Sequence, residues 1–337
     1  MPEHDLARYD ITTVNLACAA GLPGAERIDV PLCLGWLAQA TDKVRRWTDA
    51  GLEEFFHPNP DEFKNSEAYF RVLALATVLQ RHCGVRYDPS KIGAGPEVPF
   101  ELHDQFVYGV MQGPGGTCGT LPVVYASIGR RLGYPIRLVS ARGHLFARWD
   151  DPATGERFNI ECAGEGFADL PDDHYRAWPR PISNPEEERA FGYLESFTPR
   201  RELATFISSR AFTLRDHHRF REAVETFAVA APLEPENAAY PRSILGMLAE
   251  WKAHLQTLYP PQFPRRINID SKPSEARWPW MPWEVEREFR ALHACESCLT
   301  DPRHEEWWWR PLRENRLPLR EVPTSITVNY DALLRNP

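Results

Sequence analysis

The stretch Gly113-Pro114-Gly115-Gly116-Thr117-Cys118-Gly119-Thr120 decides how this chain is interpreted, because a glycine-rich turn leads directly into a helical pattern. Apolar residues then recur on one helical face, at Leu121, Val124, Tyr125, Ile128 and Leu132. Pro122 suits the first turn of this helix and Gly133 suits its end. We therefore expect Cys118 at or just before a helix N-terminus.

A predicted β-hairpin follows the helix. Residues 135–141 are strand-like, and residues 144–149 and 156–161 flank a strong turn signal at 150–155. Pairing Trp149 with Glu156 would set His144 opposite Glu161, whereas a two-residue slip would set Asn159 opposite His144. Either register places the apolar side chains on the other, buried face; these are Leu145, Ala147, Phe158 and Ile160.

These residues form a pattern that suits nucleophilic catalysis by a thiol. A helix N-terminus and a nearby imidazolium both favour the thiolate form of a cysteine. The histidine then needs a third group to fix its tautomer and orientation. The sequence supplies Cys118 as nucleophile, His144 as base, and Glu161 or Asn159 as the orienting group. The Cys118 backbone N–H is one candidate oxyanion donor, and the amide of Gln112 or Gln105 is the second.

The same segments resemble the transglutaminase-like superfamily, a papain-related group of Cys-His-Asp/Asn proteins. The resemblance covers about residues 65–175 and rests on short motifs at 116–119, 131–135, 143–146 and 158–161. It implies Cys118 as nucleophile and His144 as base. Glu161 stands where the family usually has Asp. Gln112 lies six residues before Cys118, the spacing of the oxyanion glutamine in papain-like proteases.

The expected fold class is α+β, with a papain- or transglutaminase-like core in which the Cys-bearing helix packs on an antiparallel sheet. Helices are also predicted over 31–48, 66–82, 243–256 and 283–297, and as a pair over 202–231 that breaks near Asp216. The expected domains are 1–195, transglutaminase-like with a helical N-terminal lobe; 196–256, helical; and 257–337, a tail rich in Trp and Pro that packs on the core.

Residues 220–230 and 235–237 resemble the second helix of a tetratricopeptide repeat. Some bacterial transglutaminase-like proteins carry such a helical tail after the core, so the resemblance indicates a bacterial type. One or two repeats cannot bury a core alone, because about three are needed. The helical segment is therefore expected to dock on the Cys domain or on a protein partner.

Composition narrows the functional classes. The net charge is -8 and no long basic run occurs, which argues against nucleic-acid binding. No apolar run approaches the ~18 residues needed to cross a bilayer, so no membrane association is expected. The N-terminus lacks the features of a secretion signal, and the cysteine count is odd, at seven. We therefore expect a cytoplasmic protein with reduced thiols.

Two further clusters have alternative interpretations. His293, Cys295, Cys298 and His304 are zinc-ligand types at short spacing, but a Cys-x-x-Cys on a helix more often simply packs. Trp278, Trp280, Trp283 and Trp307–Trp309 suit stacking on sugars or proline-rich peptides, but more often such residues attach an irregular tail to a core. The sequence predicts no cofactor and no metal, and no calcium loop is recognisable.

Two functional hypotheses follow. In the first, Cys118 attacks a peptide or protein amide, a thioester forms, and water or an amine resolves it, so the protein is a peptidase, an amidase or a transglutaminase. In the second, the same core is a catalytically inactive scaffold, and its helical tail holds a protein partner. The sequence does not decide between water and amine as the acceptor.

Overall fold

In its described residues the chain is an α+β protein, with many helices and a three-stranded antiparallel sheet. The computed structural model describes residues 3–93, 101–258 and 283–300. The chain divides into two compact units, Met1–Thr213 and Leu214–Pro337. The division falls inside helix α10 (Pro199–Asp216), eighteen residues after the boundary expected at 195.

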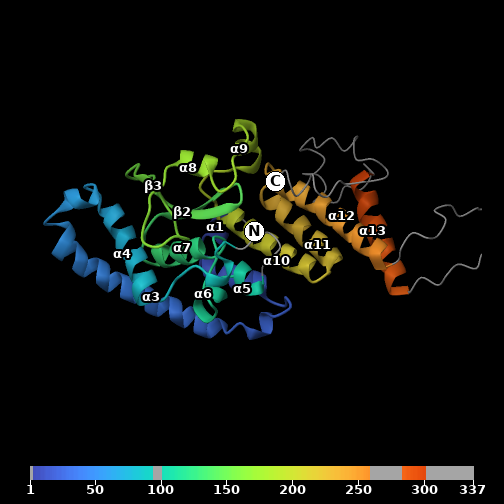
Figure 1. The fold of residues 1–337 in the computed structure, drawn as a ribbon, viewed down its shortest axis with the longest axis horizontal. Helices are drawn as coiled ribbons and strands as arrows, with labels where there is room; N and C mark the ends of the chain where they lie inside the picture. Colours follow the sequence, from blue (N-terminus) through green and yellow to red (C-terminus); the bar gives the residue numbers. More distant parts are fainter. Residues whose placement is uncertain (1–2, 94–100, 259–282, 301–337) are drawn as a thin grey trace, which may run out of the picture. The chain divides into compact units, whose positions relative to one another are not determined.

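Two long helices form one side of the first unit (Figure 1): α3 (Val30–Gly51) and α4 (Glu67–His82). The Asp29 carboxylate accepts the backbone N–H of Leu32 at 2.9 Å, and Pro31 occupies the first turn of α3. Ser66 caps α4 in the same way. These caps satisfy N–H groups that a helix leaves unpaired, and both helices predicted from the apolar spacing are confirmed.

Helix α7 (Leu121–Arg131) is the central element of this unit and is buried along almost its whole length. It packs against the sheet on one side and against α3 and α4 on another. Gly133, with φ +83°, ends it in the left-handed conformation that glycine adopts at little cost. Prediction and structure agree on this helix, because apolar spacing, Pro122 and Gly133 all define it.

The sheet contains β1 (Ile136–Ala141), β2 (His144–Asp150) and β3 (Arg157–Ile160), in that order. Trp149 pairs with Phe158 rather than with Glu156, so both registers proposed from the sequence are wrong by an even number of residues. Gly155 has φ +75° and therefore belongs to the turn, not to a pair with Asp150. Because the shift is even, the predicted apolar face is correct.

Both faces of the sheet are covered. Leu138, Ala147 and Ile160 face the large core that α3, α4 and α7 complete. Val139, Phe146 and Tyr175 form a smaller cluster on the opposite face. His144 shares the face of Phe146, since alternate residues of a strand point the same way.

Several short helices complete the first unit: α1 (Glu3–Leu6), α2 (Ile11–Ala19), α5 (Leu102–Gln105), α6 (Tyr108–Gln112), α8 (Asp172–Ala177) and α9 (Pro185–Phe191). Sequence periodicity did not predict them, because four to nine residues contain at most about two helical turns. Helices α5 and α6 directly precede the Cys118 turn and help to position it.

In the second unit, α11 (Phe220–Ala230) packs on α12 (Ala239–Leu258), and α12 packs on α13 (Trp283–Thr300). Phe227, Ile244 and Trp251 are buried there. The predicted helices are confirmed, including the break after Asp216. Trp278, Trp280, His304 and Trp307–Trp309 lie outside the described residues.

Within the part of the chain that the structure describes, no helix combines the length and the apolar character that a membrane span requires.

Candidate active site

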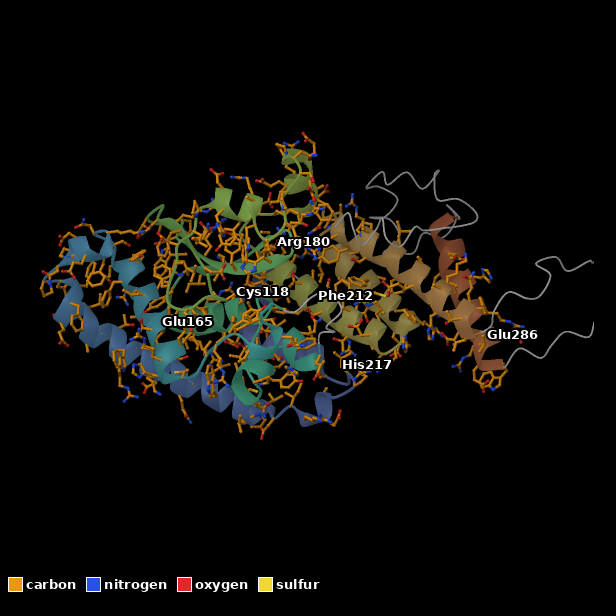
Figure 2. The ribbon with its side chains drawn as sticks, viewed as in Figure 1. Cys118, Glu165, Arg180, Phe212, His217 and Glu286 are labelled. Atoms are coloured by element: carbon orange, nitrogen blue, oxygen red, sulfur yellow. The ribbon has the colours of Figure 1, made fainter. Side chains whose placement is uncertain are left out.

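The turn that carries Cys118 is held by its neighbour Thr117. The Thr117 carbonyl accepts the N–H groups of Thr120 and Leu121, at 3.1 and 3.0 Å. The Thr117 hydroxyl accepts the N–H of Gly119 at 3.2 Å, and the Thr117 N–H donates to the Thr120 hydroxyl at 2.9 Å. Cys118 therefore lies in the first hydrogen-bonded turn that leads into α7, half-buried and close to the helix N-terminus. Figure 2 places it beside α7 in the first unit.

A second segment supports this turn from the side. The Gly116 N–H donates to the Arg86 carbonyl at 3.0 Å, and the Asp88 N–H donates to the Gly116 carbonyl at 2.8 Å. Gly115 has φ +150°, and a Cβ built on it would lie 2.9 Å from the Arg86 carbonyl oxygen. This close approach of two backbones explains why glycine stands at position 115.

His144 begins β2 and brings its imidazole to Cys118. The side chain is buried, and its Nε2 lies 2.9 Å from Glu161 Oε2. Nδ1 is the ring nitrogen that remains to interact with the Cys118 side chain. Burial lowers the pKa of His144, but the hydrogen bonds and charges of Cys118 and Glu161 outweigh burial and raise that pKa to about 9. The imidazole is therefore held as an imidazolium at neutral pH.

Glu161 is fixed by three donors. Its Oε2 accepts from His144 and from the Tyr175 hydroxyl at 3.1 Å, and its Oε1 accepts the Ala163 N–H at 2.8 Å. Burial acts to raise the pKa of Glu161, but the hydrogen bond and charge of His144, aided by the other two donors, lower it below its usual value. The carboxylate is thus ionised and oriented, as a group that positions a histidine must be.

Aromatic rings enclose the histidine. Tyr175 lies nearly parallel to the imidazole at a centroid distance of 5.9 Å, and it stacks on Phe146 at 3.8 Å. Trp178 meets the imidazole edge to face at 4.9 Å and is 45% exposed. Trp178 is thus an aromatic side chain that contacts His144 and also faces solvent. The sequence alone did not indicate these three residues.

Asn159 does not contact His144. Its Oδ1 accepts from Arg148 Nε at 2.6 Å, and its Nδ2 donates to the Leu170 carbonyl and to Asp172 Oδ1, both at 2.8 Å. These contacts place it in a buried polar cluster that joins β2 and β3 to α8. Of the two orienting groups left open by the sequence, the structure brings Glu161 to the histidine.

Gln112 is held elsewhere. Its Oε1 accepts from the Asp29 N–H at 3.2 Å and from the Cys33 thiol at 3.3 Å, at the N-terminus of α3. Within the described residues no contact joins it to Cys118 or His144. We therefore do not retain Gln112 as an oxyanion donor, because its amide already serves the end of a helix. Gln105 ends α5 and is half-buried.

Tyr87 is the neighbour of Cys118 that sequence reasoning missed. Burial raises the pKa of Tyr87, and the charge of Cys118 adds to this rise. The Cys118 backbone N–H, which lies near the phenol oxygen, opposes the rise. Tyr87 pairs with Gly116 through the backbone, which brings it alongside the Cys turn. A parallel bridge between residues 29 positions apart leaves no periodic signal in the sequence.

The other groups singled out from the sequence do not join this site. His293 Nδ1 lies 3.3 Å from Glu296 Oε2, one turn along α13. Cys295 is half-buried, and the side chain of Cys298 lies outside the description, as does His304. The structure therefore does not test a zinc site at these four residues.

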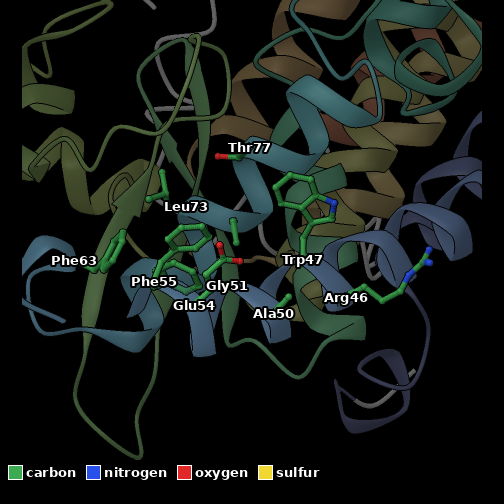
Figure 3. A pocket seen from close by; sticks show the side chains of 11 residues that line it. Arg46, Trp47, Ala50, Gly51, Glu54, Phe55, Phe63, Leu73 and Thr77 are labelled. Atoms are coloured by element: carbon green, nitrogen blue, oxygen red, sulfur yellow. The ribbon is translucent and has the colours of Figure 1, made fainter. Parts of the chain in front are cut away.

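A pocket of about 670 Å³ lies away from the candidate site, between α3 and α4 (Figure 3). Apolar side chains such as Trp47, Phe55, Phe63 and Leu73 line it, with Arg46 and Glu54 at its polar positions. None of the residues around Cys118 lines this pocket.

No family model, curated protein or solved structure matches this chain. The interpretation of the site therefore rests on its own geometry.

Proposed function

We propose that this protein is a cysteine acyl transferase or hydrolase that acts on amide or peptide bonds through Cys118, His144 and Glu161. One observation carries the proposal: the Cys118 side chain meets an imidazole whose other nitrogen is held by an ionised, half-buried carboxylate. Nucleophile, base and orienting group form one connected chain, which is the arrangement that activates a thiol.

The reaction would run in two steps. The Cys118 thiolate attacks the carbonyl carbon of an amide, and the bond to nitrogen breaks as the His144 imidazolium gives its proton to the leaving amine. A thioester remains on Cys118. Neutral His144 then takes a proton from water or an amine, which attacks the thioester and releases the acyl group as an acid or a new amide.

The developing oxyanion needs donors near Cys118. The Cys118 backbone N–H faces the Tyr87 hydroxyl, so a substrate carbonyl oxygen at this position would meet one backbone donor and one phenol donor. We assign Tyr87 to the role first considered for Gln112. Trp178, which contacts His144 and faces solvent, would then line the approach of the substrate.

This chemistry fits the resemblance to the transglutaminase-like superfamily, in a papain-like core made of the Cys-bearing turn, α7 and the sheet. We propose a peptide or protein amide as substrate. The reaction requires a reduced thiol, and the cytoplasmic location expected from the sequence would keep it reduced.

The pH dependence of Cys118 alkylation tests the proposal. Iodoacetamide labelling is followed by peptide mass spectrometry in the wild type and in His144→Ala. We expect fast labelling of Cys118 near pH 6.5 in the wild type and labelling at least about tenfold slower in the variant, because the imidazolium stabilises the thiolate. Burial raises the pKa of Cys18 and of Cys33 to about 11, so both provide slow thiols in the same sample.

His174→Ala is the matched control. His174 packs on Tyr175 and Trp178 beside the site but does not contact Cys118. Its loss should leave the alkylation profile unchanged. Equal rates in the wild type and His144→Ala would overturn the enzymatic proposal and favour the alternative, an inactive scaffold that binds a protein partner through its helical segment.

A further inference from the structure

A second cluster, made of side chains that commonly bind metals, lies next to the Cys118 turn. Asp88, His103 and Asp104 each offer one ligand atom, and these three atoms lie within 4.8 Å of one another. Both carboxylates are almost completely buried, with 1% of each side chain exposed. None of the three takes part in the proposed acyl transfer.

Within the described residues, each carboxylate accepts hydrogen bonds through only one of its two oxygens. Asp88 Oδ1 accepts the N–H and the hydroxyl of Ser90, both at 2.8 Å. Asp104 Oδ2 accepts the Glu101 N–H at 2.7 Å and the Lys91 ammonium at 2.8 Å. Among the described residues, Asp88 Oδ2 and Asp104 Oδ1 have no hydrogen-bond donor, although both are buried. Burying a carboxylate oxygen without a hydrogen-bond donor lowers the stability of the folded protein. Two such oxygens that lie close together therefore point to a bound ligand.

The histidine lies between these two oxygens. His103 Nε2 is 3.6 Å from Asp88 Oδ2 and 3.6 Å from Asp104 Oδ1. This separation is too long for a hydrogen bond. It is close to the edge of a tetrahedron of ligands around a metal, which is roughly 3.4 Å for metal–ligand distances of about 2.1 Å.

The other nitrogen of His103 has the partner that a metal ligand needs. His103 Nδ1 lies 3.3 Å from Glu101 Oε2. A carboxylate that accepts the Nδ1 hydrogen fixes the tautomer in which the Nε2 lone pair is available. Glu101 is also the N-cap of α5, whose residues include His103 and Asp104, so one short helix and its cap orient two ligands and their support.

We propose that Asp88, His103 and Asp104 bind a divalent transition-metal cation of the zinc class. One imidazole and two carboxylate oxygens suit such a cation. Ca²⁺ would need six to eight oxygen ligands, and Mg²⁺ rarely takes an imidazole. The cation would replace the absent donors of the two buried oxygens, and the Lys91 ammonium would balance part of the carboxylate charge.

This cation would act on the Cys118 turn through the backbone. The Asp88 N–H donates to the Gly116 carbonyl, and the Thr117 hydroxyl donates to the Asp104 carbonyl at 2.9 Å. The backbones of Asp88 and Asp104 are thus hydrogen-bonded to Gly116 and Thr117, the two residues that precede Cys118. Metal binding would join the 86–88 segment to α5 and hold the turn between them. Metal binding at this site does not require a reactive thiol. Its test is therefore independent of the proposed function.

Zinc binding by the full-length chain tests the proposal. The protein is stripped with a chelator, and its affinity for Zn²⁺ is measured by competition with a chromophoric chelator. We expect one Zn²⁺ per wild-type chain and an affinity at least about tenfold lower in His103→Gln. The matched control is His57→Gln, because His57 also lies 3.6 Å from a carboxylate, that of Glu53, but on an exposed helical turn. This control should bind Zn²⁺ as the wild type does.

Co²⁺ provides the second measurement, because its spectrum reports the ligand type. Binding at this site gives a spectrum without a thiolate-to-cobalt charge-transfer band, and circular dichroism checks that His103→Gln is folded. Three results would overturn the proposal: no stoichiometric Zn²⁺ in the wild type, equal affinity in wild type and His103→Gln, or a charge-transfer band that places the metal on cysteines. The first would indicate that the His103 side chain alone lies between the carboxylates.

Discussion

At the scale of single residues, Glu161 takes the place that the resemblance gives to an aspartate, and its longer side chain still reaches His144 Nε2 at 2.9 Å. The additional methylene is accommodated because Glu161 follows the last residue of β3 and its oxygens are fixed by Ala163 and Tyr175. A flexible carboxylate would lose this orientation to side-chain entropy. The neighbours of the glutamate therefore immobilise its carboxylate beside His144.

The first prediction concerns the charge of Glu161. Glu161→Gln keeps the size of the side chain but removes the negative charge that helps to raise the pKa of His144. That pKa should fall from about 9, so fewer chains hold an imidazolium beside Cys118 at neutral pH. We expect Cys118 alkylation at pH 7 to slow by about twofold, since a fall of about two pKa units, to about 7, would leave half of the chains with an imidazolium.

Glu165→Gln is the control for this charge change, because Glu165 is exposed and follows Glu161 by four residues. Its alkylation profile should match the wild type. If Glu161→Gln also matches the wild type, the carboxylate does not orient the histidine.

Asn159 provides a contrasting prediction. Asn159→Ala removes a buried amide and leaves Arg148 Nε and the Leu170 carbonyl without their partners. We expect the free energy of unfolding to fall by about 2–3 kcal/mol, the cost of unpaired buried polar groups. Because Asn159 does not contact the histidine, the Cys118 alkylation profile should not change. Urea denaturation measures the first quantity, and a shifted profile would contradict the second.

The sequence predicted the proximity of Cys118, His144 and Glu161 better than their surroundings. Cys118, His144 and Glu161 could be placed because a helix start and strand parity are local properties of the sequence. Tyr87 and the Asp88–His103–Asp104 cluster were missed, since a backbone bridge and a short helix bring these residues together without any periodic pattern. Gln112 was misplaced because spacing alone does not say which neighbour an amide binds.

At the scale of elements, the turn before α7 depends on two backbones in close contact. A Cβ at Gly115 would lie 2.9 Å from the Arg86 carbonyl and 3.0 Å from the Asp88 nitrogen, at a φ that side chains rarely adopt. At Gly119 the nearest atom to a Cβ is the Thr117 hydroxyl at 3.5 Å, an ordinary contact. Two glycines four residues apart therefore have different tolerances to substitution.

This difference gives a paired prediction. Gly115→Ala should lower the free energy of unfolding by about 2 kcal/mol or more, because it combines backbone strain with a steric clash. It should also slow Cys118 alkylation by separating the turn from residues 86–88. Gly119→Ala should change stability by less than about 1 kcal/mol and leave the alkylation rate near that of the wild type. Thermal denaturation with parallel labelling compares the two, and equal effects would contradict this account of the turn.

The predicted helices matched the structure wherever helical spacing, caps and breakers agreed, as in α3, α4 and α7. The hairpin register did not, because the pairing depends on where the turn ends, and only the structure shows that Gly155 lies inside it. The error was an even number of residues, which preserves the faces of a strand. The predicted face of His144 was therefore correct even though its predicted opposite residue was not.

At the scale of the whole molecule, every group assigned to the site lies between Tyr87 and Trp178, inside the first unit. The main core of that unit draws on residues from Ile11 to Phe206 and includes none from the second unit. The second unit has a helical core of its own around Trp251. Helical patterns had indicated a helical segment after residue 195, and the division into units falls later, inside α10.

The last prediction follows from this division. A chain that ends at Asp216 retains the whole core around α7 and all groups near Cys118, so it should fold and alkylate Cys118 with the pH profile of the full chain, within about twofold. Amide exchange on α7 checks that the shortened chain is folded. A markedly faster rate would indicate that residues after 216 restrict access to Cys118. A slower rate with α7 still protected would indicate that those residues help to position the thiol and the imidazole, and the reaction would then belong to the whole chain rather than to its first unit.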